Sequence, residues 1–290
     1  MTPLEAMASA IDERERGAPA LKPDNEARVV FLDGVARERR PLAVVYVHGF
    51  TASQAEGDPA HRAIARACGA HLYLARLHDH GSDAPDAMAG ASPERWRDDA
   101  EVAYQAGLQL GERVLLVGTS MGASLALDLA ARHADTVAGL VAWSPGIRVH
   151  DPVQLRAAVL LEGPVVPPGE RSPYQRAYWS SVVHSDAYRA IARLFHERMR
   201  PEVLRQVCCP VLFGAWDGGD GDRDTLTSVA AMREAFEWLG TPREARRFIA
   251  YDHAAHVLAN PHRSPAAGRV RVDALGFLGE AGLLDIAHRP

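Results

Sequence analysis

The sequence predicts an α/β protein with a mostly parallel central sheet, helices on both faces and an inserted helical cap. Short apolar runs bounded by turn residues recur along the chain, and segments with helical spacing separate them. Strands that alternate with helices form a parallel sheet covered on both faces. The alternation stops between about residues 146 and 206, where the chain becomes rich in Pro and aromatic residues. That interruption indicates an insertion after one strand.

The predicted strands are apolar runs between turn signals. The clearest, LeuAlaValValTyrVal at 42–47, ends at His48-Gly49 and is typical of a strand buried on both faces. The other strands are expected at 28–33, 71–77, 113–118, 136–143, 209–217 and 246–251.

Capping signals mark the helices. Ser92-Pro93 combines an N-cap with Pro at the first helical position, and apolar residues follow at helical spacing. Asp58-Pro59 repeats this signal, and Gly69 is expected to end that helix near Cys68. Further helices are expected at 123–133, 225–239 and 270–278.

These elements predict three parts of the chain. Residues 1–27 are polar and aperiodic, which indicates a loose N-terminal tail with room for one short helix. The core is expected over 28–145 and 207–290, and 146–206 is expected to form the cap.

Composition excludes several classes of protein. The chain has 290 residues and a formal net charge of -5, which argues against binding to nucleic acid or to an anionic membrane surface. No run approaches the roughly 18 apolar residues of a membrane span, so we expect no integral membrane association. The 3 cysteines, two of them adjacent, indicate free thiols in a reducing compartment. Because the first residues also lack the pattern of a signal peptide, we expect a cytoplasmic protein.

Gly118-Thr119-Ser120-Met121-Gly122 fits the pattern G-x-S-x-G. An apolar strand precedes it and an Ala/Leu-rich helix follows, which is the context in which such a serine is exposed on a sharp, strained turn. The glycines allow strand and helix to approach closely. The pattern therefore predicts that Ser120 is a nucleophile.

A second motif, His48-Gly49-Phe50-Thr51, follows the strand at 42–47. An oxyanion hole requires two backbone N–H groups that are fixed before charge develops. We expect Phe50 and Met121 to supply them, because one follows this strand and the other follows the nucleophile.

With these motifs the chain resembles the α/β-hydrolases of the carboxylesterase and monoacylglycerol-lipase type. The resemblance covers about 42–145 and 207–280, whereas 146–206 matches only in position. Asp79 departs from the family, which usually has Gly before the His-Gly pair. The residues that carry the resemblance are His48–Thr51, Arg76–Gly81, Trp96 and Val117–Gly122.

The resemblance implies a catalytic triad in the order Ser, acid, His. Asp217, in Gly214-Ala215-Trp216-Asp217, takes the acid position at a strand end, with Asp220 as the alternative. Asp222 and Asp224 are expected to belong to a solvated loop and a helix cap. The base is expected after the last strand, where the frame Ala254-Ala255-His256-Val257 favours His256 over His253.

The resemblance further implies a serine hydrolase that cleaves carboxylic esters through an acyl-enzyme on Ser120. Short or medium acyl esters or monoacylglycerols are the expected small-molecule substrates, and the chemistry requires no metal or organic cofactor. A thioesterase or a C–C or amide hydrolase would use the same triad. A non-catalytic α/β-hydrolase scaffold is the alternative of another class. A homo-oligomer is compatible with the sequence.

Overall fold

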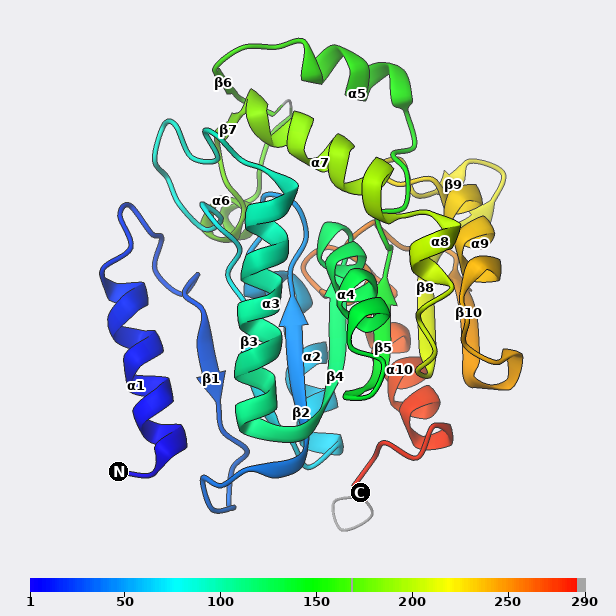
Figure 1. Cartoon of the computed structure of the whole chain (residues 1–290). Helices are drawn as coiled ribbons and strands as arrows, with labels where there is room; N and C mark the ends of the chain where they lie inside the picture. The colour runs from blue at the N-terminus through cyan, green and yellow to red at the C-terminus, as the bar shows by residue number, and fades with distance from the viewer. Residues whose placement is uncertain (168, 286–290) are drawn as a thin grey trace.

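The computed structural model describes residues 1–167 and 169–285, and its centre is an 8-stranded sheet (Figure 1). Its strands are β1 (Arg28–Val30), β2 (Arg40–Val47), β3 (His71–Leu74), β4 (Gly111–Thr119), β5 (Val137–Trp143), β8 (Val211–Gly219), β9 (Asp222–Arg223) and β10 (Arg246–Tyr251). Their order is β1-β3-β2-β4-β5-β8-β10, and β9 pairs with β8. All neighbours on this path pair in parallel except β1 and β3, which confirms the predicted mostly parallel sheet.

Helices cover both faces of the sheet, as predicted. The near face in Figure 1 carries α1 (Pro3–Arg16), α3 (Pro93–Leu110), α4 (Met121–Arg132) and α9 (Val229–Trp238). The far face carries α2 (Ala60–Ala67) and α10 (Ala267–Glu280). Each face has its own apolar core, and the fully buried side chains of β2 and β4 alternate between the two cores. A strand buried on both faces explains why 42–47 is apolar throughout.

The expectation of a loose tail over 1–27 is wrong for α1. Thr2 and Glu5 form a capping box at the start of this helix, and the side chains of Leu4 and Ile11 are buried against the sheet. The buried carboxylate of Glu15 contacts Arg76 and accepts the N–H of Ala27 at 3.0 Å. Two apolar residues at a spacing of seven are sufficient for one buried stripe in a helix that is otherwise polar.

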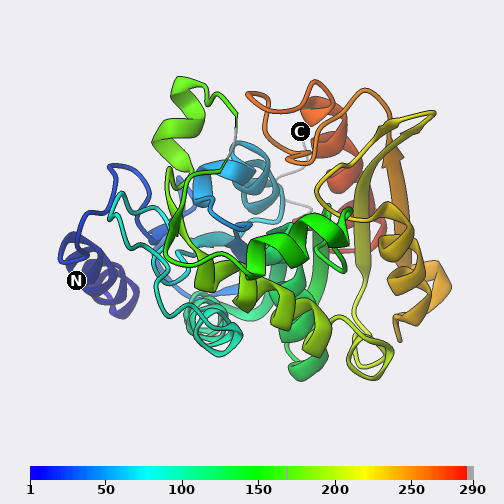
Figure 2. The same ribbon diagram turned by 90° about the horizontal axis from the view of Figure 1, so that it is seen from above.

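The segment between β5 and β8 lies over the carboxyl ends of the strands (Figures 1 and 2). It contains α5 (Pro152–Val159), β6 (Pro164–Val165), α6 (Pro173–Tyr178), β7 (Val183–His184), α7 (Ser185–Arg198) and α8 (Pro201–Leu204). The division into core and cap stays a prediction. Residue 168 of the predicted cap and residues 286–290 of the predicted core lie outside the described residues. Among the described helices, none has both the length and the apolar character needed to cross a bilayer.

Candidate active site

Ser120 lies at the turn from β4 to α4. Its backbone has φ 55° and ψ -121°, a strained conformation for a residue other than Gly. The Ser120 N–H donates to the carbonyl of Trp143 at 2.9 Å, which fixes the turn against the end of β5. The residue is 8% exposed. This is the strand–turn–helix context that the sequence motif predicts.

The flanking glycines are required by close backbone contacts. A Cβ on Gly122 would lie 2.1 Å from the carbonyl oxygen of Val47 and 2.4 Å from that of His48. A Cβ on Gly118 would lie 2.7 Å from the backbone of Gly122 and Ala123. The turn therefore rests directly on the loop that follows β2.

We expect Gly122→Ala to destabilise the protein by about 3 kcal/mol, the upper end of the usual cost of overpacking, because backbone atoms must move to admit the methyl group. Chemical denaturation with both proteins measures the difference. Gly268→Ala is the matched control, since a Cβ at Gly268 in α10 meets nothing within 4 Å. Equal free energies of unfolding for Gly122→Ala and wild type would contradict the close contact.

His256 is paired with Asp224. The Nδ1 atom of His256 lies 2.6 Å from Oδ2 of Asp224, whose side chain is 0% exposed. The same carboxylate accepts the N–H groups of Leu226 at 2.8 Å and Thr227 at 3.1 Å, and the hydroxyl of Thr227 at 2.8 Å. These bonds orient the carboxylate toward the imidazole, so Asp224 can hold one tautomer and stabilise a positive charge on His256.

The pair is tuned electrostatically. Burial opposes the ionisation of Asp224, but His256 and the two N–H donors outweigh it and lower the Asp224 pKa to about 2. Burial also disfavours the imidazolium form of His256. The charges of Asp224 and Glu56 overcome this effect and raise the His256 pKa above its ordinary value. A base with a raised pKa takes a proton from a hydroxyl more readily.

The interpretation of Asp217 as the partner of the histidine is wrong. The Asp217 carboxylate accepts from Arg233 at 2.8 Å, in an ion pair whose arginine is 53% exposed. His256 contacts Asp224 instead. The helix-cap role expected for Asp224 is also wrong, because Ser228 caps α9 by accepting the N–H of Ala231 at 3.2 Å.

The alternatives His253 and Asp220 are also separate from this pair. The His253 side chain is 88% exposed, and its N–H donates to Asp222 at 2.7 Å. Asp222 in turn accepts from the indole of Trp216 at 2.7 Å. Asp220 is exposed at the tip of a turn with φ 38°. The structure therefore places His256, and not His253, against the Asp224 carboxylate.

A hairpin explains the misplaced acid. β8 continues beyond the predicted strand end to Gly219, turns at Asp220-Gly221 and returns as β9. The N–H of Asp224 then bonds to the carbonyl of Trp216 at 3.0 Å, so the chain arrives beside Asp217 a second time, seven residues later. The Asp-Gly pair between two short runs was the available signal for this hairpin.

Ser120 and His256 are tied to the same turn. Ser120 bonds through its N–H to Trp143, and the hydroxyl of the next residue, Ser144, donates to the carbonyl of His256 at 2.8 Å. Ser144 has φ 45°, and its N–H bonds to Gly214 at the neighbouring strand end. The ends of β4, β5 and β8 thus hold the serine and the histidine at one edge of the sheet.

The expected oxyanion donors border the same edge. Met121 is the first residue of α4, so its N–H has no acceptor within the helix. The N–H of Phe50 has no hydrogen-bond acceptor in the part of the chain that the structure describes. The loop that carries Phe50 is held by His48, whose ring bonds to the carbonyl of Gly49 at 2.9 Å and to the N–H of Leu77 at 3.1 Å. Burial lowers the His48 pKa to about 4, which keeps this ring neutral.

The backbone conformation of Asp79 explains why it can replace the Gly that the family usually has here. Its φ is 59°, in the left-handed region that Gly adopts without strain and Asp tolerates better than most residues. Asp79 therefore preserves the turn.

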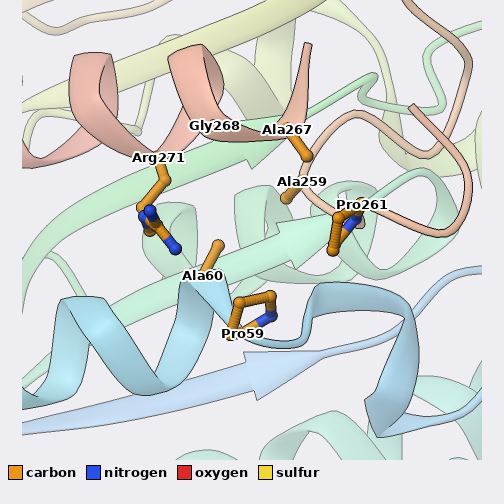
Figure 3. A pocket seen from close by; sticks show the side chains of 7 residues that line it. All are labelled: Pro59, Ala60, Ala259, Pro261, Ala267, Gly268 and Arg271. Carbon is orange, nitrogen blue, oxygen red and sulfur yellow. The ribbon is translucent and has the colours of Figure 1, made fainter. Parts of the chain in front are cut away.

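A separate surface hollow lies between α2 and α10 (Figure 3). Small and apolar residues line it together with Arg271, and Ser120, Asp224 and His256 do not border it. No group of three His, Cys, Asp or Glu side chains within 1–167 and 169–285 is arranged to hold a metal ion.

Part of the chain is similar in sequence to a lipase. The chain is 35% identical over 104 residues to the thermostable monoacylglycerol lipase of Bacillus sp. (strain H-257). That match spans 36% of this chain and only 40% of the lipase.

Solved structures share the fold. A chain of the metagenome-derived lipolytic enzymes LipS and LipT superimposes with a TM-score of 0.71 at 18% identity, over 90% of this chain and 99% of that one. The monoacylglycerol lipase of Paleococcus ferrophilus gives 0.66 at 15% identity, over 88% and 99%. The monoglyceride lipase of Saccharomyces cerevisiae gives 0.67 at 13% identity, over 88% and 91%. These similarities confirm the α/β-hydrolase fold.

The family model described as serine aminopeptidase, S33, matches residues 39–209, which is more than half of the chain. This range includes the loop after β2, the turn at Ser120 and most of the segment between β5 and β8. The chain therefore belongs to the serine aminopeptidase S33 family of α/β-hydrolases.

Proposed function

We propose that this protein is a serine hydrolase that cleaves carboxylic esters through an acyl-enzyme on Ser120. The observation that carries the proposal is the pair of His256 and the buried Asp224, 2.6 Å apart, at the same edge of the sheet as the strained turn of Ser120. A structural histidine does not require a fully buried carboxylate with three further donors. An imidazole that accepts a proton during the reaction does require such a carboxylate, because the carboxylate stabilises its positive charge.

In the proposed reaction, the triad and the oxyanion donors act first in the formation of the acyl-enzyme and again in its hydrolysis. His256 accepts the Ser120 proton at Nε2 while the serine oxygen attacks the acyl carbonyl, and Asp224 stabilises the imidazolium. The N–H groups of Phe50 and Met121 hold the negative oxygen of the tetrahedral intermediate. His256 then protonates the leaving alcohol. Water repeats the sequence on the acyl-enzyme and releases the acid.

Short or medium acyl esters or monoacylglycerols are the proposed substrates. The lipase relatives support this class, as does the aromatic surface where the segment between β5 and β8 meets the core. The Phe50 ring lies 5.6 Å from that of Tyr188 in α7 and 6.0 Å from that of Trp96, centre to centre. Trp96 is fully buried behind Phe50, and the half-buried rings of Phe50 and Tyr188 offer apolar surface for an acyl chain.

A fluorophosphonate probe followed by intact-mass spectrometry tests the nucleophile, because it modifies only an activated serine. We expect one adduct, which peptide mapping places on Ser120. A panel of p-nitrophenyl esters, monoacylglycerols, an acyl thioester and an aminoacyl p-nitroanilide then identifies the bond that is cleaved. A folded protein without an adduct would contradict the proposal and favour a scaffold, and turnover of the anilide alone would replace ester cleavage by amide cleavage.

A further inference from the structure

A buried glutamate lies beside the proposed site, outside the triad and the oxyanion donors. Glu56 belongs to the short helical turn η1 (Gln54–Gly57) and is 2% exposed. Its Oε2 atom accepts the N–H of Gly49 at 2.6 Å and the hydroxyl of Tyr46 at 3.3 Å. A buried carboxylate is costly, so its hydrogen bonds indicate what it holds.

These bonds connect the two loops that carry the proposed oxyanion donors. The Tyr46 hydroxyl also lies 3.0 Å from the hydroxyl of Thr119, the residue before Ser120. Gly49 is the residue before Phe50. The chain of contacts from Gly49 through Glu56 and Tyr46 to Thr119 therefore spans the gap between the end of β2 and the end of β4.

The carboxylate also lies close to the reacting groups. Both Glu56 oxygens and the Cβ of Ser120 lie within 3.1 Å of the point that a Cβ on Gly49 would occupy. The negative charge of Glu56 favours the protonated form of His256, in addition to Asp224. One side chain is thus near the nucleophile, the base and the backbone of the oxyanion loop.

Contacts with α6 and with the loop after β10 fix the turn that carries Glu56. The carbonyl of Ala55 accepts the hydroxyl of Tyr174 at 3.0 Å and the side-chain amide of Asn260 at 2.7 Å. Tyr174 belongs to α6, and Asn260 to the loop that also carries His256. With its backbone held in this way, Glu56 cannot move away without breaking contacts on both sides.

We propose that Glu56 is a positioning residue of the Ser120 site. It sets the spacing between the N–H groups of Phe50 and Met121, and its carboxylate supplies a second negative charge that strengthens His256 as a base. The proposal rests on the function proposed above and extends it.

Titratable groups from several elements surround Glu56. Tyr46 lies on β2 and Tyr174 on α6, and the loop after β10 contributes His256 and Arg263. His61 of α2 contacts the same helical turn, since its ring lies 3.0 Å from the carbonyl of Gln54. Burial raises the Glu56 pKa to about 7, against the bond from Gly49 and the positive charge on His256. Since His256 and Glu56 stabilise each other's charged forms, removal of the carboxylate lowers the pKa of His256.

Glu56→Gln and Glu56→Met separate the two roles. Gln can still accept the N–H of Gly49, so we expect kcat within about threefold of wild type at the optimal pH. The acid limb of kcat/KM should move to lower pH, because His256 loses a neighbouring negative charge, and the shift is confined to the pH range in which Glu56, with its pKa of about 7, is ionised. Met keeps the volume and loses the acceptor, so kcat should fall about 10- to 100-fold with little change in KM. Glu15→Gln is the matched control, since that buried glutamate also accepts a backbone N–H, but beside the edge strand β1.

The measurement is a pH series of kcat and KM with a p-nitrophenyl ester, with product determined by chromatography and folding checked by circular dichroism. An acid limb for Glu56→Gln that coincides with wild type would overturn the electrostatic role. Wild-type kcat for a folded Glu56→Met would overturn the positioning role. If Glu56→Met does not fold, Glu56→Gln tests this role instead. A more than tenfold loss of kcat in Glu56→Gln would then overturn the positioning role, because Gln still accepts the N–H of Gly49. A shift of the same size in Glu15→Gln would also count against the proposal. Wild type without turnover or fluorophosphonate labelling would overturn the proposed function itself, which is a distinct result.

Discussion

Ser120→Ala is expected to lower kcat/KM for an ester by about 10⁶-fold, the loss that follows removal of a serine nucleophile from a triad. The mechanism forms its covalent intermediate on this oxygen, and a methyl group cannot replace it. The residual rate of Ser120→Ala should still exceed that of the uncatalysed reaction, because substrate binding and the oxyanion donors remain. Ser120→Ala should also give no fluorophosphonate adduct.

Ser92→Ala is the control for this variant. Its hydroxyl caps α3 by accepting the N–H of Arg95 at 3.3 Å, so its loss costs about 1 kcal/mol of stability and leaves turnover unchanged. Steady-state assays measure both purified variants. The enzyme concentration is varied, so that traces of contaminating esterase are detected. If Ser120→Ala kept more than a hundredth of the wild-type rate, the acyl-enzyme on Ser120 would have to be abandoned.

Asp224→Asn is expected to lower kcat by about 10⁴-fold while the protein stays folded. The Asn oxygen can still accept the N–H groups of Leu226 and Thr227 that the carboxylate accepts now. Its amide, however, would donate to Nδ1 of His256 and leave the proton on Nε2. The imidazole could then not receive the proton of Ser120.

Asp217→Asn provides the matched control, because it makes the same change at the acid that the sequence pattern favours. Asp217 pairs with the half-exposed Arg233, and exposed ion pairs contribute about 0–1 kcal/mol to stability. We expect its kcat within about twofold of wild type. Comparison of the two variants in one assay decides between the acids, and a larger loss in Asp217→Asn would contradict the assignment of Asp224.

Local patterns were sufficient for most of the fold and for the turn at Ser120. The strand at 42–47, the cap at Ser92-Pro93 and the G-x-S-x-G turn each depend on a few consecutive residues, and the structure has them where the sequence predicts them. The tail was misjudged because α1 buries only a narrow stripe, which composition alone does not reveal.

The sequence by itself determined the fold class and the turn at Ser120, because periodicity, caps and glycines act within one element. Only the tertiary structure decided which aspartate reaches His256. Asp224 and His256 are 32 positions apart, and their contact depends on a hairpin that carries the chain past Asp217 and back. Glu56 became visible for the same reason, since its significance lies in a bond to Gly49 and in neighbours on other strands. Contacts between residues that follow different strands, at one edge of a parallel sheet, depend on how several loops pack together. No single stretch of sequence encodes these contacts.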